Sequence, residues 1–415
     1  MKEKILLCIV TLDSKSTWTP EDEAAEMQEL IESCGGEVIE TVFCKAIPPT
    51  ASHLITKGKV EEIQSLCRQG SIDCVIFSMD LKGRQQRNCE EDFGVKVLDR
   101  TQVILDIFAK HATSLEGKMQ VELAQLQYML PRLVGSNTAL SRQGGGIGTS
   151  GPGETKLEVD RRRISARIAK LKTELKEVTQ SRQTKRKRRK DHEVPTVALV
   201  GYTNAGKSTL LNALTGAGTV THDGLFTTLD SLSRHAALPN NRKIILSDTV
   251  GFMHDLPHGL IEAFKATLEE VQQADLLLHV LDISNDNYKN LYAAVNAVLK
   301  ELKAEGKPVI VVLNKIDRLE HKARLKDVIF AGLPAIGISA AKGENVQMLL
   351  LLIEEKLCPD RQEIDVLLPP GRMDLVNLAH TQGQVHDMAF TAKGIRLKAS
   401  VPFKTAGMIT RLGLD

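Results

Sequence analysis

The 415-residue sequence has few aromatic residues, an odd number of cysteines and no long apolar run. Aromatic residues make up 4 % of the chain, so any surface that stacks bases must be small. The seven cysteines lack C-x-x-C spacing, which favours reduced buried thiols in a cytoplasmic protein over a disulfide framework. No apolar run approaches the roughly 18 residues that a membrane span needs. The apolar start, residues 1–12, lacks a small-residue cleavage site and is predicted to be a strand.

The charge is small overall but unevenly distributed. The formal net charge is +2, yet residues 154–190 hold 15 Lys and Arg against 5 Asp and Glu, so the remainder is net acidic. Such asymmetry indicates an element that binds a polyanion. The densest part, residues 182–190, can be interpreted as a solvated linker before a domain boundary or as a nucleic-acid contact. Its density favours the second interpretation.

The patterns predict a mixed α/β protein with four domains: 1–113, 114–190, 195–357 and 358–415. In the first domain, strands alternate with helices, which indicates a small α/β fold. The strands are predicted at 4–10, 37–43, 74–78 and 95–98, and the helices at 21–34, 60–67 and 101–111. Lys57-Gly58-Lys59 is interpreted as a turn with solvated lysines, with a phosphate contact as the alternative. The last domain is expected to be small and α+β, with strands at 385–391 and 395–401.

The second domain is predicted to be an antiparallel helical hairpin. Apolar residues recur at alternating spacings of three and four along 116–133, where Pro131 ends the pattern, and along 156–182. The connecting segment 144–153 holds six glycines in ten residues. It is interpreted either as a flexible connector or as a bare tip that approaches RNA. Five arginines flank this segment and could neutralise phosphates: Arg132, Arg142, Arg161, Arg162 and Arg163.

The third domain opens with a G-x-x-x-x-G-K-S motif between an apolar strand and a helix. The motif spans Gly201, Tyr202, Thr203, Asn204, Ala205, Gly206, Lys207 and Ser208. Backbone N–H groups of such a loop cradle phosphates, the lysine reaches the terminal phosphates, and the serine hydroxyl binds Mg²⁺. The sequence therefore predicts a nucleoside triphosphate site here.

Four further motifs follow in order, and three of them follow predicted strands. The predicted nucleotide contacts in these motifs are Phe226, Thr227, Thr228, Leu229 and Asp230; Asp248, Thr249, Val250 and Gly251; Asn314, Lys315, Ile316 and Asp317; and Ser339, Ala340 and Ala341. The Asp317 carboxylate is expected to accept two hydrogen bonds from guanine, which adenine cannot donate. The order and spacing predict a guanine-nucleotide site at one edge of a parallel sheet.

The same motifs predict how a phosphoryl group is transferred. Lys207 is assigned to the β- and γ-phosphates, Ser208 and Thr228 to Mg²⁺, Asp248 to a Mg²⁺-bound water and the Gly251 N–H to the γ-phosphate. Phe252 stands where a glutamine would orient water, so unaided hydrolysis is expected to be slow. Ribosomal RNA or protein acting in trans is the first candidate for the missing element. The second is K⁺ held by Asn204, whose alternative role is to brace the loop.

These motifs resemble the HflX family of Obg-like GTPases. The resemblance rests on G-Y-T-N-A-G-K-S-T-L-L-N, L-F-T-T-L-D and D-T-V-G-F in the third domain. Earlier in the chain it rests on K-G-K-V-E-E-I (57–63), V-L-D-R-T-Q-V-I-L-D-I-F (97–108), V-E-L-A-Q-L-Q-Y-M-L-P-R-L (121–133) and G-P-G-E-T-K-L-E-V-D-R-R-R-I (151–164). It covers about residues 1–358 and is loose afterwards. Two positions depart from the family pattern: Ser150 replaces the usual arginine, and Thr56 replaces a glycine.

The resemblance implies a Ras-like P-loop G domain that binds GTP, GDP and Mg²⁺. It further implies a cytoplasmic, monomeric GTPase that binds the large ribosomal subunit and splits stalled or idle ribosomes, with the glycine-rich tip near the peptidyl-transferase centre. A peripheral location at the membrane is the alternative to a purely cytoplasmic one, and no stable membrane insertion is expected. Two alternative functions are an RNA-remodelling, helicase-like NTPase and a GTPase switch that regulates a membrane protease.

Overall fold

The computed structural model describes most of the chain. It covers residues 2–11, 18–45, 52–133, 156–191, 194–216, 226, 232–254, 257, 265–319, 332–357, 361–391 and 393–413. The chain separates into two compact units. The first comprises Met1–Thr184, His222–Asp230 and Asp255–Ala266, and the second comprises Lys185–Thr221, Ser231–His254 and Thr267–Asp415. The division into four domains remains a prediction.

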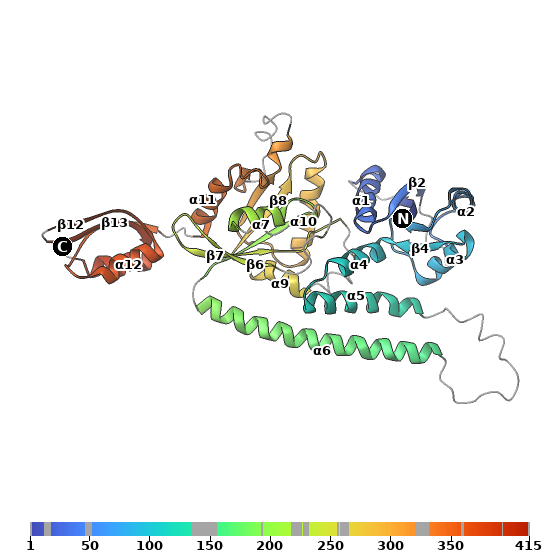
Figure 1. Ribbon diagram of the computed structural model, residues 1–415, viewed down its shortest axis with the longest axis horizontal. Coiled ribbons are helices and arrows are strands. Elements are labelled where there is room, and N and C mark those ends of the chain that lie inside the picture. The colour runs from blue at the N-terminus through green and yellow to red at the C-terminus, as the bar shows by residue number, and fades with distance from the viewer. Residues whose placement is uncertain are drawn as a thin grey trace. The chain divides into compact units, whose positions relative to one another are not determined.

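The first unit contains a parallel four-stranded sheet in the order β2-β1-β3-β4 (Figure 1). The strands are β1 (Lys4–Thr11), β2 (Glu37–Lys45), β3 (Cys74–Phe77) and β4 (Lys96–Asp99). The helices are α1 (Pro20–Ser33), α2 (Lys57–Gly70), α3 (Gly83–Phe93) and α4 (Arg100–His111). Apolar residues of α2 and α3 pack on one face of the sheet. A buried 2.9 Å ion pair joins Arg100 of α4 to Glu26 of α1.

Two local expectations about this sheet need correction. Lys57-Gly58-Lys59 is not a turn, because these residues form the first turn of helix α2. Thr56 caps this helix, since its side-chain oxygen accepts a hydrogen bond from Lys59 N at 3.4 Å. Helix α3 was not expected, because it is a mainly polar helix with little apolar periodicity and only Gln85, Cys89 and Phe93 buried. The six cysteines that the structure describes are free thiols.

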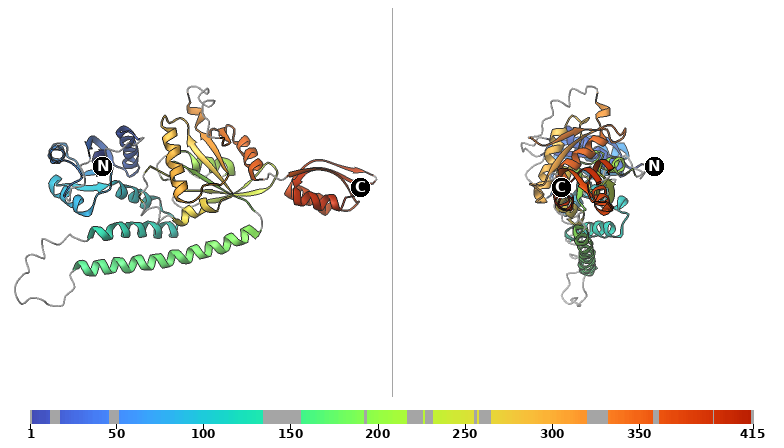
Figure 2. Two further views of the ribbon diagram at one scale, coloured as in Figure 1. Left: turned by 180° about the vertical axis from the view of Figure 1, so that it is seen from behind. Right: turned by 90° about the vertical axis from the view of Figure 1, so that its left-hand side faces the viewer.

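The helical hairpin is confirmed. Helices α5 (Leu115–Leu133) and α6 (Lys156–Asp191) lie side by side in both ribbon views (Figures 1 and 2). Their shared core consists of Met119, Leu123, Ile168 and Leu171. Arg167 of α6 forms a bidentate ion pair with Glu122 of α5, with both N–O distances 2.6 Å. The basic residues 182–190 continue α6, which extends beyond the helix end predicted at residue 182.

The second unit contains a six-stranded sheet in the order β10-β9-β8-β5-β7-β6. Its strands are β5 (Thr196–Gly201), β6 (Ser233–Ala237), β7 (Lys243–Asp248), β8 (Leu276–Asp282), β9 (Val309–Asn314) and β10 (Ala335–Gly337). Only β6 runs antiparallel to its neighbour. The accompanying helices are α7 (Lys207–Thr215), α9 (Lys265–Gln273), α10 (Tyr288–Glu301), η2 (Ile316–Arg318) and α11 (Val346–Leu357). Apolar residues of α7 and α11 share a core with the central strands.

The end of the chain forms a small α+β structure, as expected. Strands β11 (Arg361–Leu368), β12 (Gln384–Thr391) and β13 (Gly394–Pro402) pair in the antiparallel order β11-β13-β12. Helices α12 (Met373–Gln382) and α13 (Phe403–Arg411) share a core with this sheet. None of the helices in the described residues is both long and apolar enough to cross a membrane.

Candidate functional site

The G-x-x-x-x-G-K-S loop connects β5 to α7 at the carboxyl end of the central strand. Lys207 is buried, and its Nζ donates to the carbonyl oxygens of Gly201 and Tyr202 at 3.1 and 2.8 Å. Burial lowers the pKa of Lys207 to about 8, and the Asp248 carboxylate opposes this shift. Gly206 has φ +91°, which favours glycine. The loop is therefore wrapped around its own lysine.

Backbone bonds join this loop to the segment after β7. Thr203 N donates to Phe252 O at 2.8 Å, and Phe252 N donates to Gly201 O at 3.1 Å. Asn204 is exposed and has φ +59°, a left-handed conformation that asparagine tolerates better than most residues. Ala205 is buried. The loop and the D-T-V-G-F motif therefore form one connected edge.

Ser208 and Asp248 are in direct contact. The Ser208 hydroxyl donates to Asp248 Oδ2 at 2.7 Å, and the Asp248 side chain is buried at the end of β7. A hydroxyl and a carboxylate are oxygen ligands of the kind that Mg²⁺ takes, together with waters and substrate phosphates. In the described ranges no group of three or more His, Cys, Asp and Glu could hold a metal. The pair thus suits a Mg²⁺ ion that the nucleotide helps to bind.

The residues after Asp248 are held by the core. The Thr249 hydroxyl donates to Leu199 O of β5 at 2.7 Å, and Val250 and Phe252 are buried. A buried Phe252 ring cannot orient a water molecule, as the sequence predicted. Gly251 lies between these two anchored residues. Its backbone N–H therefore has a defined position for a phosphate contact.

Asn314 connects two of the predicted loops. Its Nδ2 donates to Ala205 O at 2.9 Å, and its Oδ1 accepts from Ala340 N at 3.0 Å. Ser339 and Ala340 are buried, whereas Ala341 is exposed. The Asn314 side chain thus bridges the phosphate loop and the loop after β10.

Asp317 lies in the short helix η2, next to buried Ile316. A hydrogen bond from the Ser339 side chain, and to a lesser extent the Lys342 and Arg318 charges, lower the pKa of Asp317. Lys342 Nζ lies 3.9 Å from Asp317 Oδ2. The carboxylate is therefore kept ionised beside the S-A-A-K loop, as recognition of guanine N–H groups requires.

One contact of this site was missed in the sequence. Lys315 Nζ forms a 2.7 Å ion pair with Asp282 Oδ2, at the end of the adjacent strand β8. An aspartate at a strand end beside the N-K-x-D motif was the available signal. The ion pair orients the aliphatic stem of Lys315. The backbone of Lys315 has φ +63°.

Phe226, a predicted nucleotide contact, packs against another aromatic side chain. Its side chain is buried, and its ring packs edge-on against Phe108 of α4 with centroids 4.6 Å apart. Its φ of +56° is rare for a bulky residue. The Phe226 ring therefore contacts protein, and its nucleotide contact remains a prediction. The other residues predicted in this motif, 227–230, lie outside the described residues, and so does the proposed Mg²⁺ ligand Thr228.

The basic residues around the hairpin fall into two groups. Arg161, Arg162 and Arg163 are exposed on α6. Arg132 instead forms an ion pair with Asp99 at 3.0 Å, and its phosphate contact remains a prediction. The glycine-rich segment 144–153 and Arg142 lie outside the described residues.

His279 on β8 is a further buried group near the phosphate loop. Neither ring nitrogen has a hydrogen-bond partner among the described residues, and the ring stacks on Tyr292 with centroids 4.7 Å apart. Burial, and secondarily the Lys207 charge, lower the pKa of His279 to about 3. Protonation of this ring is therefore disfavoured in the folded state.

Because the His279 ring is buried and neutral, we expect the free energy of unfolding to depend on pH. The unfolded state, with a histidine pKa of about 6.5, takes up the proton first, so folding stability is complete above that pH and decreases as pH falls below it. Between pH 7.5 and 5.5 we expect the wild type to lose about 1.4 kcal/mol more than His279→Phe. Denaturant midpoints at both pH values measure this, with exposed His380→Gln as the control. Equal losses in wild type and His279→Phe would contradict this assignment.

Three family models match the chain. They are described as GTP-binding GTPase N-terminal, over residues 21–109; GTP-binding GTPase Middle Region, over 111–189; and 50S ribosome-binding GTPase, over 196–315. The last match includes the phosphate loop, Asp248 and Asn314. The three models together cover most of both sheets and both helices of the hairpin.

Two curated relatives support the same assignment. The chain is 47 % identical to GTPase HflX of Caldanaerobacter subterraneus subsp. tengcongensis, covering 92 % of this chain and 89 % of the relative. It is 41 % identical to GTPase HflX of Escherichia coli K12, covering 85 % and 83 %. A solved structure described as SsGBP in complex with GDP aligns with TM-score 0.45 and 29 % identity, over 85 % of this chain and 98 % of that one. The chain is a GTPase and belongs to the HflX family.

Proposed function

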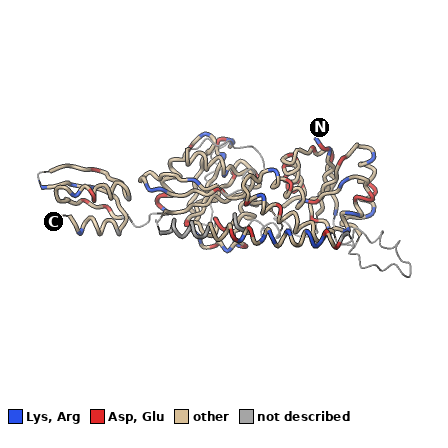
Figure 3. The backbone as a smooth tube through the Cα atoms, turned by 60° about the horizontal axis from the view of Figure 1, so that its bottom comes forward, with Lys and Arg blue, Asp and Glu red and all other residues tan. Residues whose placement is uncertain are grey.

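We propose that this GTPase binds the large ribosomal subunit and separates stalled or idle ribosomes, and that GTP hydrolysis times its release. The observation that carries the proposal is the basic helix α6 in the same chain as a guanine-nucleotide site. Figure 3 displays lysines and arginines along this helix, and Arg161, Arg162 and Arg163 are exposed. A helix of this charge suits ribosomal RNA, whose phosphates attract basic side chains. The match to a family described as 50S ribosome-binding GTPase supports the proposal.

The site residues have defined roles in this proposal. Lys207 moves from the loop carbonyl oxygens to the β- and γ-phosphates, and the Gly251 N–H donates to the γ-phosphate. Ser208 and Thr228 would bind Mg²⁺ directly, and Asp248 would hold one of its waters. When bound, Mg²⁺ neutralises charge on the phosphates. Asp317 and the loop at Ser339 select guanine.

Sedimentation with purified large subunits tests the function. We expect the protein to pellet with large subunits when a non-hydrolysable GTP analogue is present and to remain in the supernatant with GDP. Light scattering should report dissociation of intact ribosomes under the first condition. Ser208→Ala, altered at the proposed Mg²⁺ site, is the control that should not bind subunits in response to the analogue. Absence of the protein from the pellet under all nucleotide conditions would contradict the proposal.

Asn204 is the proposed site for a monovalent cation that replaces the missing glutamine. Its side chain is exposed on the phosphate loop, which leaves it accessible to an ion beside the phosphates. We expect GTP turnover to be several-fold faster in K⁺ than in Na⁺, and Asn204→Ala to remove the difference. Steady-state phosphate release in both salts measures this. Equal rates in the two salts for the wild type would leave Asn204 only the role of bracing the loop.

A further inference from the structure

The second half of α5 contacts Asp99 of β4 and Leu81 through polar side chains, while its Leu126 and Leu130 pack against the core shared with α6. Its first half has buried residues that include Met119, Val121 and Leu123, whereas the structure shows no buried residue in 125–133. Tyr128 and Arg132 are one helical turn apart and share a face. Residue 133 ends α5, so both residues lie in the last two turns of the helix.

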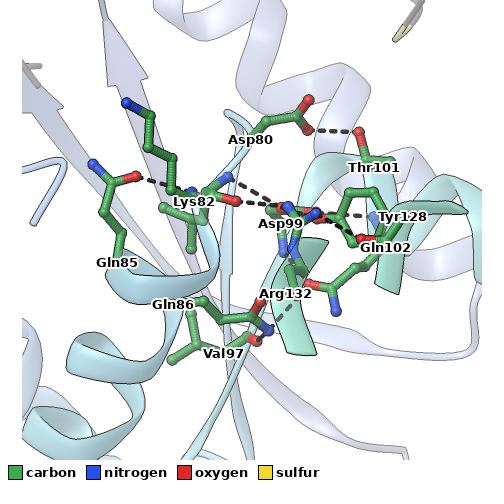
Figure 4. A network of polar contacts seen from close by, with 11 residues as sticks. Asp80, Lys82, Gln85, Gln86, Val97, Asp99, Thr101, Gln102, Tyr128 and Arg132 are labelled. Carbon is green, nitrogen blue, oxygen red and sulfur yellow. Dashed lines mark hydrogen bonds and ion pairs between the residues drawn. The ribbon is translucent and has the colours of Figure 1, made fainter. Parts of the chain in front are cut away.

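The buried carboxylate of Asp99 receives both side chains (Figure 4). Asp99 ends β4 and caps α4 by accepting from Gln102 N at 3.0 Å. It also accepts from Leu81 N at 3.1 Å, from Arg132 Nη2 at 3.0 Å and from the Tyr128 hydroxyl. Burial raises the pKa of Asp99, and the Tyr128 and backbone hydrogen bonds oppose the shift. One carboxylate thus joins three elements and uses about all its acceptor positions.

Arg132 is held on several sides. Besides Asp99, it donates from Nη2 to Leu81 O at 2.6 Å and from Nη1 to Tyr128 O at 3.1 Å. Its guanidinium carbon lies 3.4 Å from the centre of the Tyr128 ring, which adds a cation–π contact. A Cβ on Gly83 of α3 would lie 3.1 Å from Arg132 Cα, so the two backbones approach closely. Both terminal nitrogens of the guanidinium therefore donate hydrogen bonds to protein groups.

We propose that Asp99, Tyr128 and Arg132 are positioning residues that fix the end of α5 to the N-terminal sheet and so set the orientation of the helical hairpin on that sheet. This extends the proposed function, because a fixed hairpin would present its basic helix α6 to the large subunit in a constant orientation. A helix that is already held in place loses less conformational freedom when it binds. The three residues do this without touching RNA.

Three variants separate positioning from direct contact. Asp99→Asn keeps a helix cap but removes the charge that Arg132 needs. Tyr128→Phe removes only the hydroxyl, and it is the mildest change if the others destabilise the fold. Arg132→Gln removes the charge, and combined with Asp99→Asn it leaves a neutral pair that can still form a hydrogen bond. Glu122→Gln, at the exposed pair with Arg167, is the matched control on α5.

Hydrogen exchange and subunit affinity are the two measurements, made on the full chain. We expect amide exchange in 125–133 to become about tenfold faster or more in each single variant, as expected for loss of a charged hydrogen bond. Affinity for large subunits should fall by a similar factor, while GTP turnover without ribosomes stays unchanged. The double variant should recover part of both losses, and Glu122→Gln should show neither.

Two results would overturn the proposal. In the first, the amides of 125–133 exchange at the same rate in all the variants as in the wild type, which would mean that Asp99 does not hold the helix. In the second, Arg132→Gln weakens subunit binding but Asp99→Asn and Tyr128→Phe do not. That result would mean that Arg132 contacts phosphate directly. Failure of the proposed function has a different signature, because the wild type itself would not bind subunits while the exchange differences persisted.

Discussion

Replacing Asp317 with asparagine is expected to weaken GTP binding about a thousandfold and to make xanthosine triphosphate the better ligand. The ionised carboxylate, whose pKa is lowered chiefly by the Ser339 hydrogen bond, accepts from the two guanine N–H groups. Asparagine places an N–H donor where one guanine N–H also points. Xanthine carries a carbonyl oxygen there and accepts that bond.

Equilibrium binding of fluorescent GTP and xanthosine triphosphate analogues measures this change. Asp286→Asn, an exposed residue in the same unit, is the matched control and should keep the preference of the wild type for GTP. If Asp317→Asn bound both nucleotides like the wild type, guanine would not be recognised by this carboxylate. The assignment of the N-K-x-D motif would then be wrong.

Gly251→Ala is expected to reduce GTP hydrolysis at least a hundredfold while leaving GDP binding nearly unchanged. An added Cβ would lie 2.8 Å from Thr203 Cγ2, 2.9 Å from Thr203 Cα and 3.1 Å from Lys207 Nζ. The backbone must therefore move, and its N–H loses alignment with the γ-phosphate. Loss of one preorganised donor typically reduces turnover by about 10²–10³.

Single-turnover hydrolysis and nucleotide affinity separate the two effects of Gly251→Ala. GDP lacks the γ-phosphate, so its affinity should change little. Gly58→Ala on α2, where no atom lies within 4 Å of an added Cβ, is the control and should hydrolyse GTP normally. Hydrolysis by Gly251→Ala at the rate of the wild type would mean that this N–H does not contact the γ-phosphate.

The nucleotide site was largely predictable because its residues follow buried strands. Apolar runs identify β5, β7 and β9, and the residues after parallel strands meet at one edge. The motifs at Lys207, Asp248 and Asn314 could therefore be placed together before any coordinates were known. The contact between Lys315 and Asp282 could not be foreseen with the same ease, because it depends on the order of neighbouring strands.

The hairpin contacts were less predictable because their partners are distant in sequence. Arg132 looked like a phosphate contact beside a glycine-rich segment, yet Asp99, 33 residues earlier, binds it.

Phe226 likewise packs on Phe108, a contact that no local pattern indicates. The basic run 182–190 forms helix because lysine and arginine are good helix formers, a preference that its charge density obscured.

GTP turnover with and without purified large ribosomal subunits tests the central claim most directly. A site that has buried Phe252 in place of a glutamine should hydrolyse GTP slowly alone. We expect large subunits to accelerate turnover by about tenfold or more, because ribosomal groups complete the site. Identical turnover in the presence and absence of large subunits, at saturating GTP, would contradict the claim that this GTPase acts on the ribosome.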